Sequence, residues 1–457
     1  MLVQFSRRDF LRIGSLALGG LSLPQLLAAR AAAAGLGDAV RDKSVVFLMM
    51  AGGPPQQETF DPKPDAPQEV RTMTGTIPTS LPSVRFGDYF PKLARLADRL
   101  AVIRSFATES EEHEPRPITS PQTLNANLGS LYSAVIGTSH PRTGLPTNVL
   151  LTPRAIDAKA DSIFNLQHFQ ATGNFGPAHA PFMPGGASEL LRNMQLKLPT
   201  EHIAERRSLL QQLDRLQRSV DSGGAMASLD RFQTQAIETI LGGGADGLDL
   251  SRESSQVVAR YDTARLVNPQ SIGKRWSEYR KYLDHNATLG KKLLLARRLC
   301  ERGCGFVTIA NSLVWDFHAD PRNADVKSGL SYIAPTFDHA VSAFIEDCEA
   351  RGLGEKILLI CASEMGRTPK INKDGGREHW GRITPLLVYG GGLRMGQVIG
   401  QSTRDGGEPN GNRYTRRHLL GTIFHTLFDV GQLRLQSGVP KPIVDLAGSH
   451  DPIAELF

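Results

Sequence analysis

Cysteine is scarce in this chain, with only four among 457 residues, at positions 300, 304, 348 and 361. A small scaffold held together by disulfides would carry far more cysteine in a shorter chain. Cys300 and Cys304 are close enough in sequence to approach each other at the end of an expected helix. We interpret all four cysteines as small buried apolar side chains.

Long apolar runs and concentrated positive charge are also lacking. A transmembrane helix needs roughly 18 or more consecutive apolar residues, and no such run occurs, so we expect no membrane span in the mature chain. The net charge is +6, and about +3 of it belongs to residues 1–34. The rest of the chain therefore has only a weak positive electrostatic field and no cluster of Lys and Arg residues, so nucleic acid is not an expected partner.

Several well-known catalytic motifs are missing as well. The sequence has no G-x-S-x-G nucleophile elbow, no phosphate-binding G-x-x-x-x-G-K-[ST] loop and no H-E-x-x-H zinc helix. It also lacks C-x-P-x-R, in which the cysteine of sulfatases becomes formylglycine. No dinucleotide-binding fingerprint or haem motif supports an oxidoreductase, although such an enzyme would suit the leader described next.

The first 34 residues have the layout of an export signal. Ser6-Arg7-Arg8-Asp9-Phe10-Leu11 resembles the twin-arginine motif, and a mildly apolar segment and a run of alanines follow it. An amphipathic helix is the alternative, but three glycines and a proline in the segment disfavour it. We therefore expect a protein of the periplasm or cell exterior. Cargo of this pathway typically folds before export, often with a metal already bound.

Five short apolar runs predict strands that are buried on both faces. They cover residues 45–50, 100–104, 306–310, 357–362 and 385–389, and each ends in polar or glycine-rich sequence. Between the third and fourth runs, Phe337, Val341, Phe344, Ile345 and Cys348 share one face of a helix that glycines end. A strand, a helix and a strand in this order predict a parallel sheet between helices.

Residues 200–300 differ from this pattern. They are rich in Leu, Arg, Gln, Glu and Ala at helical spacing, and glycine clusters interrupt them. We interpret them as a helical insertion or cap within a single large α/β domain at residues 42–457. A second helix, over about residues 289–302, precedes the third strand.

Ligands of a parallel sheet bind beyond the carboxyl ends of its strands, so the residues after each run are candidates for the site. Carboxylates and imidazoles gather there. Such groups bind zinc, manganese or iron, whereas calcium prefers oxygen alone. We expect a divalent ion, zinc, manganese or calcium, with its identity left open. The candidate ligands are Asp61, His113, Asp316, His318, Glu364 and His379.

Each candidate also has a structural interpretation. Asp316 could cap a helix, and Glu364 could form a salt bridge with Arg367 or Arg377. His379 could stack in its loop beside Trp380. His113 lies in an acidic run and could be a solvated loop residue.

Five segments, in order, together closely resemble the exported domain-of-unknown-function-1501 family over about residues 42–457. They are Gly52-Gly53-Pro54 to Thr59-Phe60-Asp61-Pro62-Lys63-Pro64, Trp315-Asp316-Phe317-His318, Ser363-Glu364-Met365-Gly366-Arg367-Thr368-Pro369, Gly376-Arg377-Glu378-His379-Trp380, and Gly390-Gly391-Gly392 to Gly396-Gln397-Val398-Ile399-Gly400.

That family looks like a branch of the alkaline phosphatase/sulfatase-like superfamily. The resemblance implies a mostly parallel sheet between helices, with a metal-dependent hydrolase site at the strand ends. Glu364-Met365-Gly366 stands where the superfamily usually has Asp-His-Gly, so Met365 replaces an imidazole. His379 could take the place of the last metal-binding histidine of the superfamily.

The N-terminal half of the chain matches the pattern of the superfamily less well than the C-terminal half does. The superfamily places a metal-binding Asp directly after the first strand and a nucleophile later. Here the strand ends in glycines, and the nearest aspartate is Asp61. Ser105 and Thr59 are the candidate nucleophiles.

The sequence thus predicts a metal-dependent hydrolase of phosphate or sulfate esters, in which Arg367 or Arg377 holds the anionic group. The expected partner is a small anionic ester or a sulfated or phosphorylated glycan. The alternative is an envelope binding or assembly protein that keeps the fold without the chemistry, which the loss of an imidazole at Met365 and the missing nucleophile motif favour.

Overall fold

A computed structural model describes residues 37, 39–185 and 244–457. The twin-arginine segment and residues 200–243 of the proposed insertion lie outside the described residues. None of the described helices combines the length and the apolar character that a membrane crossing requires.

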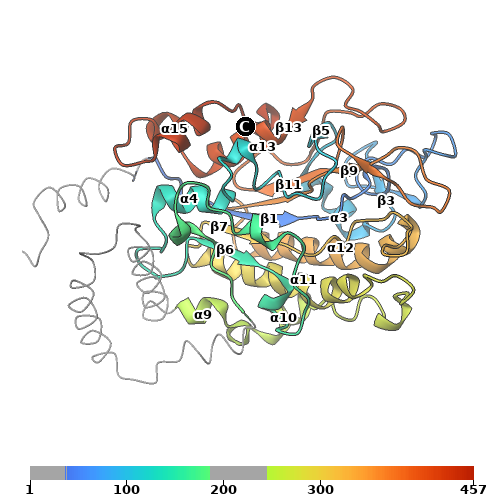
Figure 1. Ribbon diagram of the computed structural model, residues 1–457, viewed down its shortest axis with the longest axis horizontal. Helices are drawn as coiled ribbons and strands as arrows, with labels where there is room; N and C mark the ends of the chain where they lie inside the picture. The colour runs from blue at the N-terminus through green and yellow to red at the C-terminus, as the bar shows by residue number, and fades with distance from the viewer. Residues whose placement is uncertain (1–36, 38, 186–243) are drawn as a thin grey trace, which may run out of the picture.

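A seven-stranded sheet forms the centre of the protein, with helices on both faces (Figure 1). The strand order is β12-β4-β11-β8-β1-β7-β6. The strands span Ser44–Met49 (β1), Ala101–Ile103 (β4), Asn148–Leu151 (β6), Phe306–Ile309 (β7), Ile357–Ala362 (β8), Leu386–Gly390 (β11) and Gln397–Ile399 (β12). All are parallel except β11, which runs antiparallel to β8 and β4. The predicted, mostly parallel sheet between helices is confirmed.

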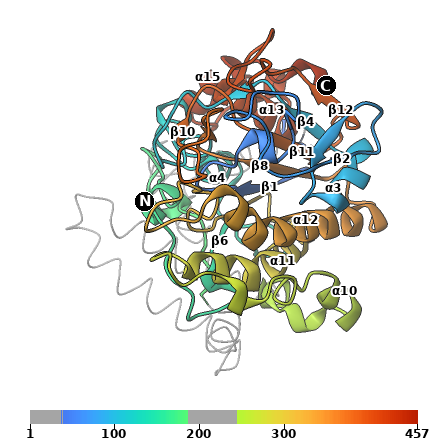
Figure 2. The same cartoon turned by 90° about the vertical axis from the view of Figure 1, so that its right-hand side faces the viewer.

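Successive side chains of β1 point to opposite faces of the sheet, and they divide the hydrophobic core into two parts. Val46 and Leu48 pack toward α11 (Arg280–Glu301), α12 (Val326–Ala350) and α3 (Pro91–Arg95). Val45 and Phe47 pack on the opposite face, toward α4 (Leu128–Ile136), α13 (Arg416–Leu427) and α15 (Lys441–Gly448). Figure 2 shows these two helical layers from the side. Because both faces are covered, the strands are continuous apolar runs.

The short remaining elements connect this framework. Two-stranded ribbons pair β2 (Thr76–Pro78) with β3 (Arg85–Gly87), β5 (Phe106–Ala107) with β13 (Tyr414–Thr415), and β9 (Gly366–Arg367) with β10 (His379–Trp380). Short helices are α5 (Leu166–Phe169), α9 (Gly244–Leu248), α10 (Ser255–Arg260) and α14 (Val430–Leu433). The four cysteines are buried and free, as predicted.

Two features place the loops at the carboxyl ends of the strands. The β9–β10 ribbon pairs Arg367 with His379, so the segment after β8 folds back on itself. At Gly52, which follows β1, φ is +108°, and a Cβ atom there would lie 2.5 Å from the backbone nitrogen of Asp316. Only glycine allows this close approach of the loops after β1 and β7.

Candidate metal centre

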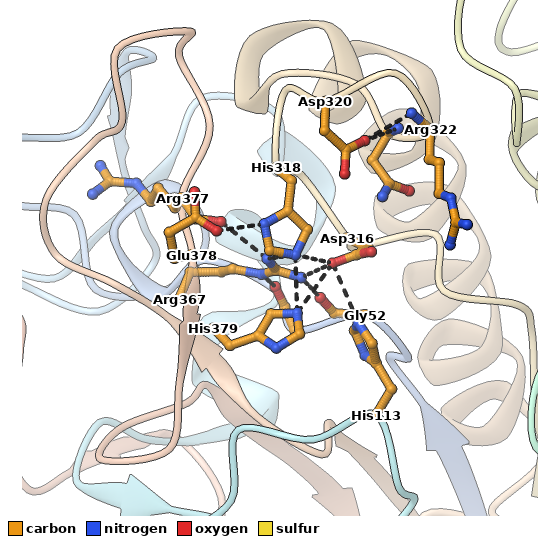
Figure 3. A network of polar contacts seen from close by, with 12 residues as sticks. Gly52, His113, Asp316, His318, Asp320, Arg322, Arg367, Arg377, Glu378 and His379 are labelled. Carbon is orange, nitrogen blue, oxygen red and sulfur yellow. Dashed lines mark hydrogen bonds and ion pairs between the residues drawn. The ribbon is translucent and has the colours of Figure 1, made fainter.

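Four donor side chains converge beyond the carboxyl ends of the strands (Figure 3). They are His113, Asp316, His318 and His379, and one ligand atom of each lies within 4.8 Å of all the others. They come from three separate parts of the chain: the loop after β5, the loop after β7 and strand β10. The fold therefore gathers residues that are up to 266 positions apart in the sequence.

The carboxylate of Asp316 is the common partner of the three imidazoles. Its Oδ1 lies 3.5 Å from His113 Nε2, 3.0 Å from His318 Nε2 and 3.6 Å from His379 Nε2. The Nε2 atoms of His318 and His379 lie 2.9 Å apart. All three rings therefore direct the same nitrogen toward one point.

The other nitrogen of each ring has an oxygen partner outside the cluster. His113 Nδ1 contacts Glu364 Oε1 at 2.9 Å, and His318 Nδ1 contacts Glu378 Oε2 at 2.7 Å. His379 Nδ1 lies 2.7 Å from the carbonyl oxygen of Glu111. An oxygen acceptor at Nδ1 holds a proton there and leaves Nε2 facing inward, which is how metal-binding histidines are oriented.

The charges around Asp316 favour its ionised form. Burial raises the pKa of this carboxyl group, but the hydrogen bonds from the three histidines and the nearby Arg367 guanidinium outweigh burial and leave the pKa well below its usual range. Burial lowers the pKa of His113, yet its bonds to Asp316 and Glu364 raise it to about 9.

Arg367 supports the cluster from behind. Its side chain is fully buried and pairs with Asp316, and its Nη1 lies 3.2 Å from His318 Nε2. Its other donors bind the carbonyl oxygens of Gly52, Gly53 and Arg377. Arg377 is also buried, and it binds Glu58 Oε1 at 2.7 Å and several backbone carbonyls.

Glu364 is not one of the four donors, and it contacts the cluster through His113. One carboxylate oxygen accepts hydrogen bonds from His113 and, at 2.7 Å, from the backbone nitrogen of Gly52, and the other accepts from Ser363 Oγ at 2.9 Å. Its partners are therefore not Arg367 and Arg377. The helix cap is likewise at Asp325, which accepts from Ser328 at the start of α12, and not at Asp316.

The other predicted residues lie apart from the four donors. Asp61 pairs with Lys63 at 3.1 Å, Arg104 at 3.4 Å and Ser402. Thr59 and Ser105 are buried, and neither lines the cavity in front of the cluster. Thr59 Oγ1 donates to the carbonyl oxygen of Pro55 at 2.9 Å.

A cavity of about 730 Å³ opens in front of the donors. His113, Asp316, His318 and His379 form one part of its wall. The residues that contribute the rest include Asp161, Phe164, Glu278, Lys281, Asn311 and Asn323. None of these wall residues was predicted from the sequence, although Asn311 lies two residues after the end of β7, where ligands of a parallel sheet bind.

The protein-family comparison matches residues 42–456 to the model described as "Protein of unknown function (DUF1501)". The chain belongs to the DUF1501 family. This confirms the resemblance that the five sequence segments indicated. No curated protein matches the sequence.

Three solved structures are similar over most of their length. Ps i-CgsB, in complex with a neocarrahexaose, has 8% identity and a TM-score of 0.34, covering 86% of this chain and 74% of its own. The PsFucS1 sulfatase from Pseudoalteromonas sp. has 13% identity and a TM-score of 0.33, covering 87% and 71%. The phosphonate monoester hydrolase from Silicibacter pomeroyi has 11% identity and a TM-score of 0.30, covering 90% and 76%. Similarity at this level assigns no activity to the chain.

Proposed function

We propose that this DUF1501 protein binds a divalent metal ion through His113, Asp316, His318 and His379 and hydrolyses phosphate or sulfate esters. One observation carries the proposal. Three imidazoles present Nε2 to a shared carboxylate, while each Nδ1 is held by an oxygen acceptor. Without an ion, protons on Nε2 must join the imidazoles to Asp316, and a bound cation would take the place of those protons.

The spacing of the donors fits an ion of the size of zinc. Tetrahedral ligands at about 2.0–2.1 Å from zinc lie about 3.3 Å from one another. The separations between donor atoms in the cluster include 2.9, 3.0, 3.5 and 3.6 Å. A small adjustment of the side chains would therefore complete the coordination.

The chemistry of the donors narrows the choice of ion. Three imidazole nitrogens and one carboxylate oxygen suit zinc, with manganese and iron as further options. Calcium takes six to eight oxygen ligands, so this donor set disfavours it. We therefore propose zinc as the first ion to test.

The bound ion would act as a Lewis acid on the ester and lower the pKa of a water molecule. Around it, Asp316 supplies negative charge, and Glu364 and Glu378 hold His113 and His318 in the correct tautomer. Arg367 fixes Asp316 and the loop after β1.

Water is the proposed nucleophile. Ser105 and Thr59 are less than 2% exposed and do not line the cavity. The cavity is open to solvent and adjoins the donors, so a water molecule can reach the ester where these hydroxyl groups cannot.

The substrate we propose is a small anionic ester or a sulfated or phosphorylated glycan, encountered outside the cytoplasm. The cavity volume of about 730 Å³ falls within the range of small-molecule sites. Export rests on the twin-arginine sequence at residues 1–34. Cell fractionation tests it, with Arg7→Lys and Arg8→Lys together expected to retain the protein in the cytoplasm.

One observation favours a second candidate, an envelope protein that binds metal or ligand without turnover. Both arginines that were expected to hold the anion are bound to internal partners. A binding protein would retain the metal and release an intact ester, which separates it from a hydrolase in the experiment below.

The test combines metal analysis with a substrate screen. Protein purified without chelators should contain one ion per chain and turn over chromogenic phosphate or sulfate esters. His379→Ala should lose both properties, and His425→Ala, which removes a histidine outside the cluster, should keep both. Bound metal without turnover would select the binding protein, and wild-type protein that takes up no ion would reject the metal-dependent hydrolase.

A further inference from the structure

Lys292 is a lysine buried behind the wall of the cavity. It lies on α11, has no exposed surface and forms no ion pair among the described residues. Burial lowers its pKa to about 7. A buried amine without a carboxylate partner is costly, so its contacts need a physical explanation.

Lys292 contacts the residues that follow β7. Its Nζ donates to the carbonyl oxygen of Ala310 at 3.2 Å and to Oδ1 of Asn311. Both acceptors are carbonyl oxygens, so the Lys292 amine donates to Oδ1 of the Asn311 amide and fixes which end of the amide faces α11. The Asn311 Nδ2 group is then the end of the amide that Lys292 does not bind.

Asn311 borders the cavity that holds the four donors. Its side chain is part of the same wall as His113 and Asp316, and it also lines a small hollow shared with His113 and Glu364. Asn311 is only 4% exposed, and its Nδ2 makes no hydrogen bond with any residue that the structure describes. A donor without a protein partner at the edge of a cavity is a position from which a ligand oxygen could accept a hydrogen bond.

We propose that Asn311 Nδ2 donates a hydrogen bond to an oxygen of the phosphate or sulfate group, and that Lys292 is the positioning residue that directs it. This inference rests on the proposed hydrolase or binding function. It also supplies a donor for the anion, which Arg367 and Arg377 do not, because neither arginine lines the cavity and both guanidinium groups bind protein oxygens. A donor whose direction is fixed before binding needs no reorganisation when the anion arrives.

The first test measures binding of inorganic phosphate to the zinc-loaded protein by calorimetry. Asn311→Ala removes the donor and should weaken phosphate binding about tenfold. Asn311→Asp keeps the contact with Lys292 but replaces the donor with a charged acceptor, so the loss should be larger. Because the new carboxylate would form an ion pair with Lys292, this second variant is expected to fold. Zinc content should match the wild type in both variants.

The second test asks whether Lys292 acts through Asn311. Lys292→Met should weaken phosphate binding several-fold in the wild-type background and have no further effect in the Asn311→Ala background. A purely structural role for Lys292 would instead give losses that multiply. For esters that turn over, the Asn311 variants should show the loss in kcat/KM.

The outcomes separate this inference from the function on which it rests. If the wild type binds zinc and phosphate and Asn311→Ala binds phosphate equally well, the donor role is overturned and the metal site stands. If the wild type binds zinc but no phosphate, the anion role of the cavity falls together with the inference. Losses that multiply in the double variant would overturn the positioning role of Lys292 alone.

Discussion

Two clusters of charged side chains in this protein differ in how their charges are balanced. The first, where α11 and α12 meet, contains Arg297, Arg298 and Arg351 with Glu253, Glu301 and Asp347. Arg297 is fully buried and lies 3.0 Å from both Glu253 and Asp347. Three cations thus meet three anions, and every carboxylate has at least one arginine partner.

The second cluster, at the strand ends, is not balanced in this way. Three imidazoles and Arg367 surround the single carboxylate of Asp316, and the Nε2 atoms of His318 and His379 face each other. The outer carboxylates, Glu364 and Glu378, bind the far side of the rings. Buried charge alone therefore does not mark a site, whereas several imidazole nitrogens that converge on one carboxylate do.

The largest contrast should come from Asp316→Asn. This change keeps the shape of the side chain but removes the charged ligand, so zinc affinity should fall by about 1000-fold, more than the 10- to 100-fold that outer partners of metal ligands typically contribute. Competition with a zinc-binding dye measures the affinity. Asp347→Asn, in the balanced cluster, is the matched control and should bind zinc like the wild type. Equal zinc affinity in the two variants would contradict the distinction between the clusters.

The reverse experiment breaks the balanced cluster. Arg297→Met leaves Asp347 and Glu253 with fewer partners in a buried position, and should lower the free energy of unfolding by about 3 kcal/mol. Denaturant unfolding checks the stability, and metal analysis should show unchanged zinc content. Lost zinc with unchanged stability would reverse the roles assigned to the two clusters.

Lys292 gives a pH-dependent test whose expected effect is of intermediate size. Its pKa is about 7 in the folded protein, below the ordinary 10.5. Between these two pH values the unfolded chain therefore holds a proton on Lys292 that the folded protein has lost. This contribution to stability therefore rises as pH rises through that window. Lys292→Met lacks it, so its stability relative to wild type should decline by about 2 kcal/mol between about pH 7.5 and pH 9. A difference independent of pH, measured by urea unfolding of the metal-free proteins, would contradict the burial of a neutral amine.

The smallest expected effect is at an outer partner. Glu378→Gln replaces the carboxylate that holds His318 Nδ1 at 2.7 Å, and should weaken zinc binding about tenfold. Glu346→Gln, on the exposed side of α12, is the control. If Glu378→Gln abolished binding altogether, Glu378 would be a direct ligand and not an orienting partner.

Much of the sheet could be predicted from the sequence because its central strands are buried on both faces. The apolar runs at residues 45–50, 306–310 and 357–362 coincide with β1, β7 and β8. Strands β6 and β12 were missed. Asn148–Leu151 begins with a polar residue, and Gln397–Ile399 is three residues long in glycine-rich sequence, so neither presents a run of sufficient length.

The direction of β11 and the partners of the charged residues depend on contacts distant in sequence. The sequence predicted that residues at strand ends would gather, and His113, Asp316, His318 and His379 do lie together. It could not distinguish an inner donor from an outer one. Glu364 and His113 differ in role only because the loop after β5 brings the imidazole between Glu364 and Asp316, at 2.9 and 3.5 Å.

The most direct test of the metal centre is anomalous X-ray diffraction from crystals of the zinc-loaded protein. We predict one strong zinc peak about 2.0–2.1 Å from Nε2 of His113, His318 and His379 and from a carboxylate oxygen of Asp316. A zinc peak elsewhere, with the three imidazoles still bonded to one another and to Asp316, would contradict this prediction.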